Sequence, residues 1–189
     1  DVSRDGRGLA FDSDRGGNFD IYKMPVEGGE VVQITTDPGK DFVPHWSPDG
    51  RAIVFHSMRG GNRDVFTIAA DGSGETQRTR APEEEMQADW SADGRALVFR
   101  VWSSNKSGYL RVLSLAGEGS PRDFSFDAVR PRWSPTGGAI CYSSDQGLGV
   151  LDVASGENRI LVPPSQRPPF PNWAPDGRTI FYVASGASP

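Results

Sequence analysis

The sequence contains few of the residues and motifs that disulfides, histidine-based catalysis and membrane insertion require. Its 189 residues include one cysteine and two histidines, so no internal disulfide can form and a histidine-based catalytic centre has few candidates. The hydrolase nucleophile motif Gly-x-Ser-x-Gly does not occur. No apolar run approaches the roughly 18 residues of a membrane-spanning helix. These absences favour neither a hydrolase nor a membrane-inserted protein.

The charge balance argues against two classes of partner. The formal net charge is -5, and nucleic acids and anionic lipids are bound through clustered lysine and arginine side chains. We therefore expect no nucleic-acid partner and no membrane insertion.

Glycine and proline are abundant, and they recur at regular intervals. The sequence has 23 glycines and 15 prolines, and the segment Trp-Ser-Pro-Asp-Gly-Arg at residues 46–51 returns in weaker copies along the chain. The aligned glycines at positions 6, 50, 94, 137 and 177 are separated by steps of 44, 44, 43 and 40 residues. A period of this size is typical of a protein built by repeating one supersecondary unit.

Each copy of the motif predicts a tight turn between two strands. Proline restricts φ at the second turn position, aspartate bonds its own backbone, and glycine adopts the left-handed conformation that closes a short hairpin. Large apolar residues stand three and five positions after each glycine, with another apolar residue between them, as in Ile53, Val54 and Phe55. This pattern indicates a strand that is buried on both faces, as in a propeller blade between two neighbouring blades.

We therefore predict an all-β protein, namely a β-propeller of four four-stranded antiparallel blades and a two-stranded fifth half-blade. The predicted repeats of this single domain cover about residues 1–41, 42–82, 83–126, 127–166 and 167–189. A single helical turn is considered at residues 83–86. Because the chain begins inside a repeat, we expect an open arc cut from a longer protein. Such an arc would self-associate through its exposed strand edges.

A second pattern sharpens the assignment. Residues 13–22 and 57–66 share the spacing Ser-x-Arg-x-Gly-x-x-Asp, and prolines precede Trp46, Trp133 and Trp173 by two positions. With these motifs the sequence resembles the WD40-like β-propeller repeat family, whose consensus centres on Pro-x-Trp-Ser-Pro-Asp-Gly, as in the TolB C-terminal domain. The third and fourth repeats lack the Arg-x-Gly-x-x-Asp part.

The resemblance implies a six-bladed ring, a periplasmic or extracellular location, and a non-catalytic binding or scaffold module with a protein or peptide partner. Similar propellers also precede the catalytic domain of prolyl-oligopeptidase-type serine peptidases. The alternative is therefore the gating portion of such a peptidase, with its catalytic domain outside this chain. The discriminating feature is the sequence that follows Pro189 in the parent protein.

Variation between the repeats predicts which face binds a partner. The loops that join the second and third strands share one face with those that join successive blades, and only these loops differ between repeats. Binding loops are commonly the variable segments of a rigid scaffold. The candidate contact residues are Asp37, Lys40, Asp41, Arg59, Glu83, Glu84, Glu85, Trp102, Arg130 and Arg167.

Four polar residues directly precede the repeated tryptophans. His45, Asp89, Arg132 and Asn172 are expected on the innermost strands, where they either solvate a central channel or bind a small molecule or ion. The acidic cluster at residues 12–20 lacks the ligand pattern of an EF-hand. His56 aligns with chemically unrelated residues in the other repeats, which favours a structural role. We thus predict no metal ligand, no cofactor and no catalytic residue.

Overall fold

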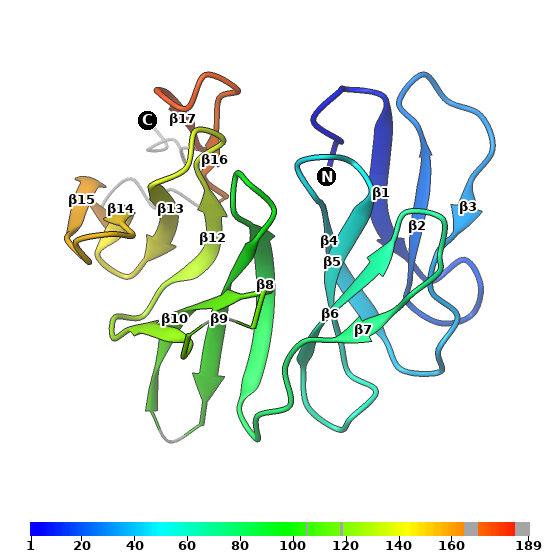
Figure 1. The fold of residues 1–189 in the computed structure, drawn as a ribbon, viewed down its shortest axis with the longest axis horizontal. Coiled ribbons are helices and arrows are strands. Elements are labelled where there is room, and N and C mark those ends of the chain that lie inside the picture. The colour runs from blue at the N-terminus through cyan, green and yellow to red at the C-terminus, as the bar shows by residue number, and fades with distance from the viewer. Residues whose placement is uncertain (105, 118, 165–169, 184–189) are drawn as a thin grey trace, which may run out of the picture. The chain divides into compact units, whose positions relative to one another are not determined.

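The computed structural model describes residues 1–104, 106–117, 119–164 and 170–183. All of its regular elements are β-strands (Figure 1). They form sheets with the strand orders β1-β2-β3, β4-β5-β6-β7, β11-β10-β9-β8, β12-β13-β14-β15 and β16-β17. Because strands that are adjacent in a sheet are also adjacent along the chain, each sheet is an antiparallel meander linked by hairpins. The predicted all-β class and blade pattern are confirmed.

The chain divides into two compact units, and unit 1 comprises Asp1–Trp90. Its first sheet lacks a full innermost strand, and Val2 forms only an isolated bridge with Leu9. A core between the first two sheets buries Ile21, Phe55 and Ile68 among other apolar residues. The strands of unit 1 are β1 (Gly8–Ser13), β2 (Asp20–Pro25), β3 (Val32–Gln33), β4 (Asp41–Trp46), β5 (Ala52–Ser57), β6 (Asp64–Ala69), β7 (Thr76–Gln77) and β8 (Glu84–Trp90).

Unit 2 comprises Ser91–Pro189. Its core buries Val98, Leu110, Ile140 and Tyr142. Cys141 is also fully buried, as expected for a cysteine in a strand centre. The strands are β9 (Ala96–Ser103), β10 (Lys106–Ser114), β11 (Arg122–Phe124), β12 (Val129–Trp133), β13 (Ala139–Ser144), β14 (Gly147–Asp152), β15 (Asn158–Val162), β16 (Asn172–Trp173) and β17 (Ile180–Phe181).

The repeated turn motif is held by one hydrogen-bond network. Ser47 Oγ donates to Asp49 Oδ1 at 2.6 Å, and Ser47 Oγ also accepts the Ala52 N–H at 2.9 Å. Asp49 Oδ1 also accepts the Arg51 N–H at 3.1 Å. These bonds lower the pKa of Asp49, with the Ser47 hydroxyl as the largest cause. The turns at residues 3–8 and 91–96 repeat the network, which explains why the motif recurs.

The innermost strands or the residues just before them share an unusual backbone conformation that the sequence does not predict. Val43, Gln87, Arg130 and Phe170 all have φ between 54° and 59°, a region that residues other than glycine rarely adopt. The β4–β5 register shifts between Phe42 and His45, and the β12–β13 register shifts at the corresponding place. Val43 and Arg130 therefore mark a repeated bulge in the first strands β4 and β12, and Gln87 and Phe170 have the same backbone conformation at the equivalent repeat positions.

One local expectation needs correction. The helical turn considered at residues 83–86 is absent, because β8 begins at Glu84. The outermost strands β3 and β7 are short, with two residues each. Among the described residues, no helix has the length and apolarity needed to cross a membrane.

Candidate functional site

The predicted partner face of unit 1 is built on two similar hairpins. In the first, Asn18 Nδ2 donates to the Asp37 and Gly39 carbonyls, both at 3.0 Å. In the second, Asn62 Nδ2 donates to the Ala81 and Glu83 carbonyls, both at 2.8 Å. Each asparagine therefore ties its hairpin to the loop that leads into the next sheet. This role was not foreseen, although the repeated Arg-Gly-Gly-Asn sequence is the signal that could have revealed it.

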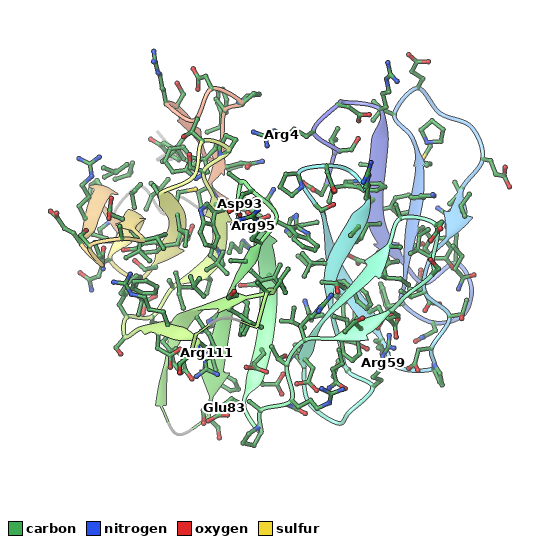
Figure 2. All side chains as sticks on the ribbon, viewed as in Figure 1. Arg4, Arg59, Glu83, Asp93, Arg95 and Arg111 are labelled. Carbon is green, nitrogen blue, oxygen red and sulfur yellow. The ribbon has the colours of Figure 1, made fainter. Side chains whose placement is uncertain are left out.

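Arg59 is the centre of the polar contacts on this face. Its Nη2 atom lies 3.1 Å from Asp41 Oδ2, and its Nε atom lies 3.5 Å from Asp37 Oδ1. Nη1 contacts Glu75, and the guanidinium carbon lies 4.4 Å from the centre of the Phe66 ring. These contacts bring three of the predicted residues together. Arg59 and Glu83 lie at one end of the unit 1 strands, and Arg4 lies at the other (Figure 2).

Two of the predicted contact residues lie inside the fold. The Asp41 side chain is fully buried, and Glu85 is 1% exposed. Burial raises the pKa of Asp41, although hydrogen bonds from Ser57 and Thr35 and the charge of Arg59 oppose that rise. Both carboxylates lie at the start of an innermost strand, directly after the loop that leads into it. They therefore lie beneath these loops and are not exposed for contact with a partner.

The other predicted residues of unit 1 are more accessible. Lys40 is exposed, whereas Glu83 and Glu84 are half-buried. Glu84 Oε2 accepts the Arg63 backbone N–H at 3.2 Å and lies 2.9 Å from Arg63 Nη1. The loop before β8 is thereby held by an ion pair as well as by Asn62.

In unit 2 the predicted face carries aromatic side chains. Trp102, near the end of β9, is 39% exposed, and Phe170 is 57% exposed. The guanidinium carbon of Arg130 lies 3.5 Å from the centre of the Phe170 ring, a cation–π contact. The Arg100 Nη2 atom lies 3.1 Å from Asp127 Oδ1. Arg167 lies outside the described residues.

The polar residues that precede the repeated tryptophans stand on the first strands of their sheets. In unit 1, the Nδ1 atom of His45 lies 3.5 Å from Asp1 Oδ1, and Asp89 is half-buried on the neighbouring strand β8. In unit 2, Arg132 is half-buried on β12 and Asn172 is exposed on β16. Their sequence positions predicted the strands, and their role in binding stays a prediction.

The tryptophans themselves link successive first strands. Trp90 Nε1 donates to the His45 carbonyl at 3.1 Å, and Trp173 Nε1 donates to the Arg132 carbonyl at 2.9 Å. The indole of Trp46 is the exception, because its Nε1 atom is buried with no hydrogen-bond partner.

His56 has the environment of a structural residue. It is 5% exposed, and its ring lies 5.8 Å from that of Phe42. Burial is the largest cause that lowers its pKa to about 3, and the charges of Arg63 and His45 contribute to the same shift. A neutral, enclosed imidazole of this kind is a poor general base near neutral pH.

The acidic cluster at residues 12–20 is organised by polar side chains of the same sheet. Gln33 Nε2 donates to Asp20 Oδ2 at 3.0 Å, and the Thr35 hydroxyl lies 3.4 Å from Asp20 Oδ1. Asp64 repeats the arrangement with Gln77 at 2.9 Å. In the part of the chain that the structure describes, no group of three or more His, Cys, Asp or Glu side chains could hold a metal ion.

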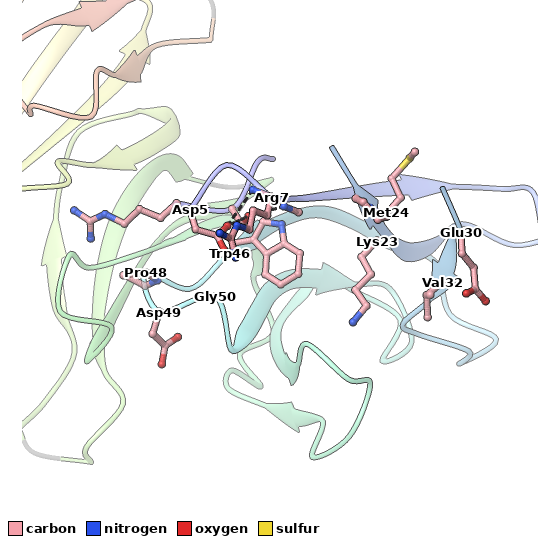
Figure 3. Close-up of a pocket in the computed structure, with 14 residues that line it drawn as sticks. Asp5, Arg7, Lys23, Met24, Glu30, Val32, Trp46, Pro48, Asp49 and Gly50 are labelled. Carbon is pink, nitrogen blue, oxygen red and sulfur yellow. Dashed lines mark hydrogen bonds between the residues drawn. The ribbon is translucent and has the colours of Figure 1, made fainter. Parts of the chain in front are cut away.

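A cavity of about 620 Å³ opens elsewhere in unit 1, between the first and second sheets. It lies at the end of the strands where the Ser-x-Asp-Gly turns are found, away from Arg59. Trp46 lies between the turn residues on one side and Lys23 and Glu30 on the other (Figure 3).

The meander sheets, the repeated turn network and the Trp links between first strands define a β-propeller repeat protein. The chain belongs to the TolB beta propeller domain family, whose model matches residues 1–163. No curated protein sequence matches the chain.

Solved structures share this fold. A TolB-type structure from Agrobacterium tumefaciens has a TM-score of 0.79 and 22% identity, covering 96% of this chain and 73% of its own. TolB from Acinetobacter baumannii has a TM-score of 0.79 and 23% identity, with 95% of this chain and 46% of its own covered. The chain therefore spans less than half of the Acinetobacter protein.

An enzyme is similar as well. A puromycin-hydrolyzing peptidase of Mycobacterium tuberculosis has a TM-score of 0.64 and 14% identity, covering 84% of this chain and 27% of its own. At these identities the likeness concerns the fold alone, because one fold supports many functions.

Proposed function

We propose that this chain is a non-catalytic protein-binding or scaffold module of the TolB propeller type. The partner, a protein or peptide, would dock on the face formed by the strand-two-to-three hairpins and the loops between sheets. The observation that carries the proposal is the exposed Phe170 ring, which the Arg130 guanidinium covers at 3.5 Å.

An exposed aromatic ring beside an arginine has the composition of a binding hot spot. Tryptophan, tyrosine and arginine are enriched where truncation costs most affinity, and large aromatic rings supply much of the buried area. Phe170 is 57% exposed and Trp102 is 39% exposed. A partner that covered either ring would gain apolar contact that the folded chain leaves unused.

The loops of unit 1 support the proposal in another way. Asn18 and Asn62 hold the inter-sheet loops through carbonyl bonds, and Arg59 ties two of their carboxylates together. Loops that are already ordered lose little conformational entropy on binding. Asp41 and Glu85 would act as supports in this arrangement, whereas Lys40 and Glu83 would be available for contact.

The test first identifies the partner and then maps the face. A photo-crosslinking phenylalanine analogue at position 170 should trap the partner, whereas the same group at position 95, in an exposed Ser-x-Asp-Gly turn, should not. With the partner purified, Phe170→Ala and Trp102→Ala should each weaken binding by roughly tenfold or more in calorimetry.

The matched controls are Arg51→Ala and Arg95→Ala, on exposed turn residues of the other face. These variants should leave the affinity unchanged. Weaker binding in the controls alone would place the partner on the turn face and would overturn the proposed docking site.

The alternative is the gating propeller of a prolyl-oligopeptidase-type peptidase. The fold similarity to the puromycin-hydrolyzing peptidase, with a TM-score of 0.64, supports it, but the two TolB structures match better, with a TM-score of 0.79 each. The parent gene decides between them. A downstream α/β-hydrolase segment with a Gly-x-Ser-x-Gly nucleophile motif would favour the peptidase.

A further inference from the structure

The cavity between the first two sheets is separate from the proposed docking face. Its volume of about 620 Å³ lies within the range of about 300–1,000 Å³ that is usual for small-molecule sites. The turn residues Asp5 and Asp49 line one side, and Lys23, Glu30 and Val32 line the other (Figure 3).

Apolar side chains also line the cavity. They are the half-buried indole of Trp46 together with Met24, Pro25 and Val32. The side chains at the same repeat positions in the next two sheets are buried, since Ile68 of β6 is 3% exposed and Trp90 of β8 is 8% exposed. Met24 and Trp46, which occupy the same repeat positions, are both half-buried. The opening is thus a property of this pair of sheets and not of the repeat in general.

The cavity also presents charges of both signs that do not neutralise each other. Lys23 Nζ donates to the Ala70 carbonyl at 2.6 Å, and an ammonium group has two further donors to offer. Glu30 is exposed. No ion pair joins it to Lys23 within the described ranges of the chain.

The remaining carboxylates are engaged by their own turns. Asp5 accepts bonds from the Ser3 hydroxyl and the Arg7 N–H, and Asp49 accepts the equivalent pair. The Arg7 side chain also lines the cavity, close enough for its charge to help lower the pKa of Asp5. Among the carboxylates, Glu30 is therefore the one left to meet a ligand, and Lys23 is the cation on its side of the cavity, whereas Arg4 and Arg7 are on the turn that also carries Asp5.

We propose that this cavity binds a zwitterion with an apolar body, namely an amino acid or a peptide of two or three residues. The ligand carboxylate would lie beside Lys23 and its ammonium group beside Glu30. Its apolar side chain would contact Trp46, Met24 and Val32. A ligand with a single charge would pair with only one of the two side chains. The other side chain would lose hydration without gaining an ionic contact, which lowers the affinity.

A matched series of dipeptides tests the inference. Leucyl-leucine carries both charges, N-acetyl-leucyl-leucine carries only the negative one, leucyl-leucinamide carries only the positive one, and the doubly blocked form carries neither. The readout is the Trp46 indole N–H resonance of nitrogen-15-labelled protein, assigned with a Trp46→Phe variant. Leucyl-leucine should shift it saturably. Each singly blocked form should bind about tenfold more weakly, because it lacks one charge-assisted contact.

Variants of the protein complete the experiment. Lys23→Gln should remove the preference for a free ligand carboxylate, and Glu30→Gln should remove the preference for a free ammonium group. The control is Arg51→Gln, because Arg51 is the counterpart of Arg7 in the next turn and does not line the cavity. It should leave all four affinities unchanged.

Several outcomes would overturn the inference. These are a resonance that does not saturate, equal affinities for leucyl-leucine and the doubly blocked form, or ligand preferences that survive in both charge variants. None of these results bears on the partner face, so this inference and the proposed function can fail separately.

Discussion

The two Arg-Gly-Gly-Asn hairpins of unit 1, at residues 15–18 and 59–62, have the same sequence and different surroundings. Their backbones agree closely, since φ is 93° at Gly17 and 96° at Gly61. Asn18 and Asn62 each donate to two carbonyls of the following loop. Local chemistry, namely a glycine at positive φ and an amide with two donors, is enough to produce this part of the structure.

The arginines of the two hairpins have different partners. The guanidinium carbon of Arg15 lies 5.2 Å from the ring centres of both Phe11 and Tyr22. Arg59 also lies over two rings, at 5.9 Å from the centre of Phe55 and 4.4 Å from that of Phe66, but it contacts Asp41, Asp37 and Glu75 in addition. Position 31, the counterpart of Glu75, is a valine. One sequence motif thus becomes an aromatic-stacked surface group in one sheet and an ion-pair centre in the next.

The largest effect that separates the hairpins is expected from Asp41→Ala. This change leaves Arg59 without its buried partner, and breaking one side of a buried ion pair costs about 3 kcal/mol of unfolding free energy. Arg15→Ala, in the matched hairpin, removes no ion pair with a buried carboxylate; it removes a long hydrogen bond to Ser13 at 3.4 Å and cation–π contacts worth about 0.5–1 kcal/mol. Urea denaturation measures both. Equal losses would show that the ion-pair centre contributes nothing beyond the stacking.

An intermediate effect is expected from His56, which occupies in the second sheet the position that Asp12 occupies in the first. Burial lowers the pKa of His56 to about 3 in the folded state, so the unfolded chain binds the extra proton below its ordinary pKa near 6.5. The stabilisation is complete above pH 6.5 and is lost as the pH falls towards 3. Between pH 7 and pH 4.5 the loss should be about 2–3 kcal/mol.

The control for this pH dependence is His56→Val, which places an apolar residue at the position, as Val183 does in the fifth repeat. The variant should lose that part of the stability change in urea titrations at a series of pH values. If the unfolding free energies of the wild type and the variant changed with pH in parallel, His56 would be protonated in the folded protein at its ordinary pKa, and the prediction would be wrong.

The smallest effect is expected where the hairpins agree. Asn18→Ala and Asn62→Ala each remove two hydrogen bonds to loop carbonyls, so each should lower the unfolding free energy by about 1–2 kcal/mol. The two losses should match within about 0.5 kcal/mol, because the two sites are separate and similarly built. A large loss in one hairpin and none in the other would mean that the two clamps are not equivalent.

The central strands could be predicted closely from the sequence. The strands at residues 8–13 and 52–57 follow a turn motif and carry the predicted apolar pattern, which is a local signal. The sequence does not mark the start of the innermost strand β4, which begins at Asp41. The reason is the bulge at Val43, a β-branched residue at positive φ, which is a conformation that its local preference opposes.

The candidate sites were only partly predictable. The variable loops identified Arg59, Trp102 and Arg130, but the burial of Asp41 and Glu85 was not visible in the sequence. Phe170 was not named as a contact residue, although its position before a proline and a repeated tryptophan marks it. Burial of a charged side chain depends on which loop covers it, and loop placement depends on contacts between residues far apart in the chain.

The sequence by itself determined the turn network, the strand order and the clamping asparagines, because each arises from residues within one repeat and returns in at least two repeats. The tertiary structure alone decided where the repeats differ. Trp90 and Ile68 are buried, whereas Trp46 and Met24 at the same repeat positions line an open cavity. Arg59 contacts carboxylates that have no counterpart beside Arg15. These outcomes depend on side chains from different sheets meeting in space, which no single repeat encodes.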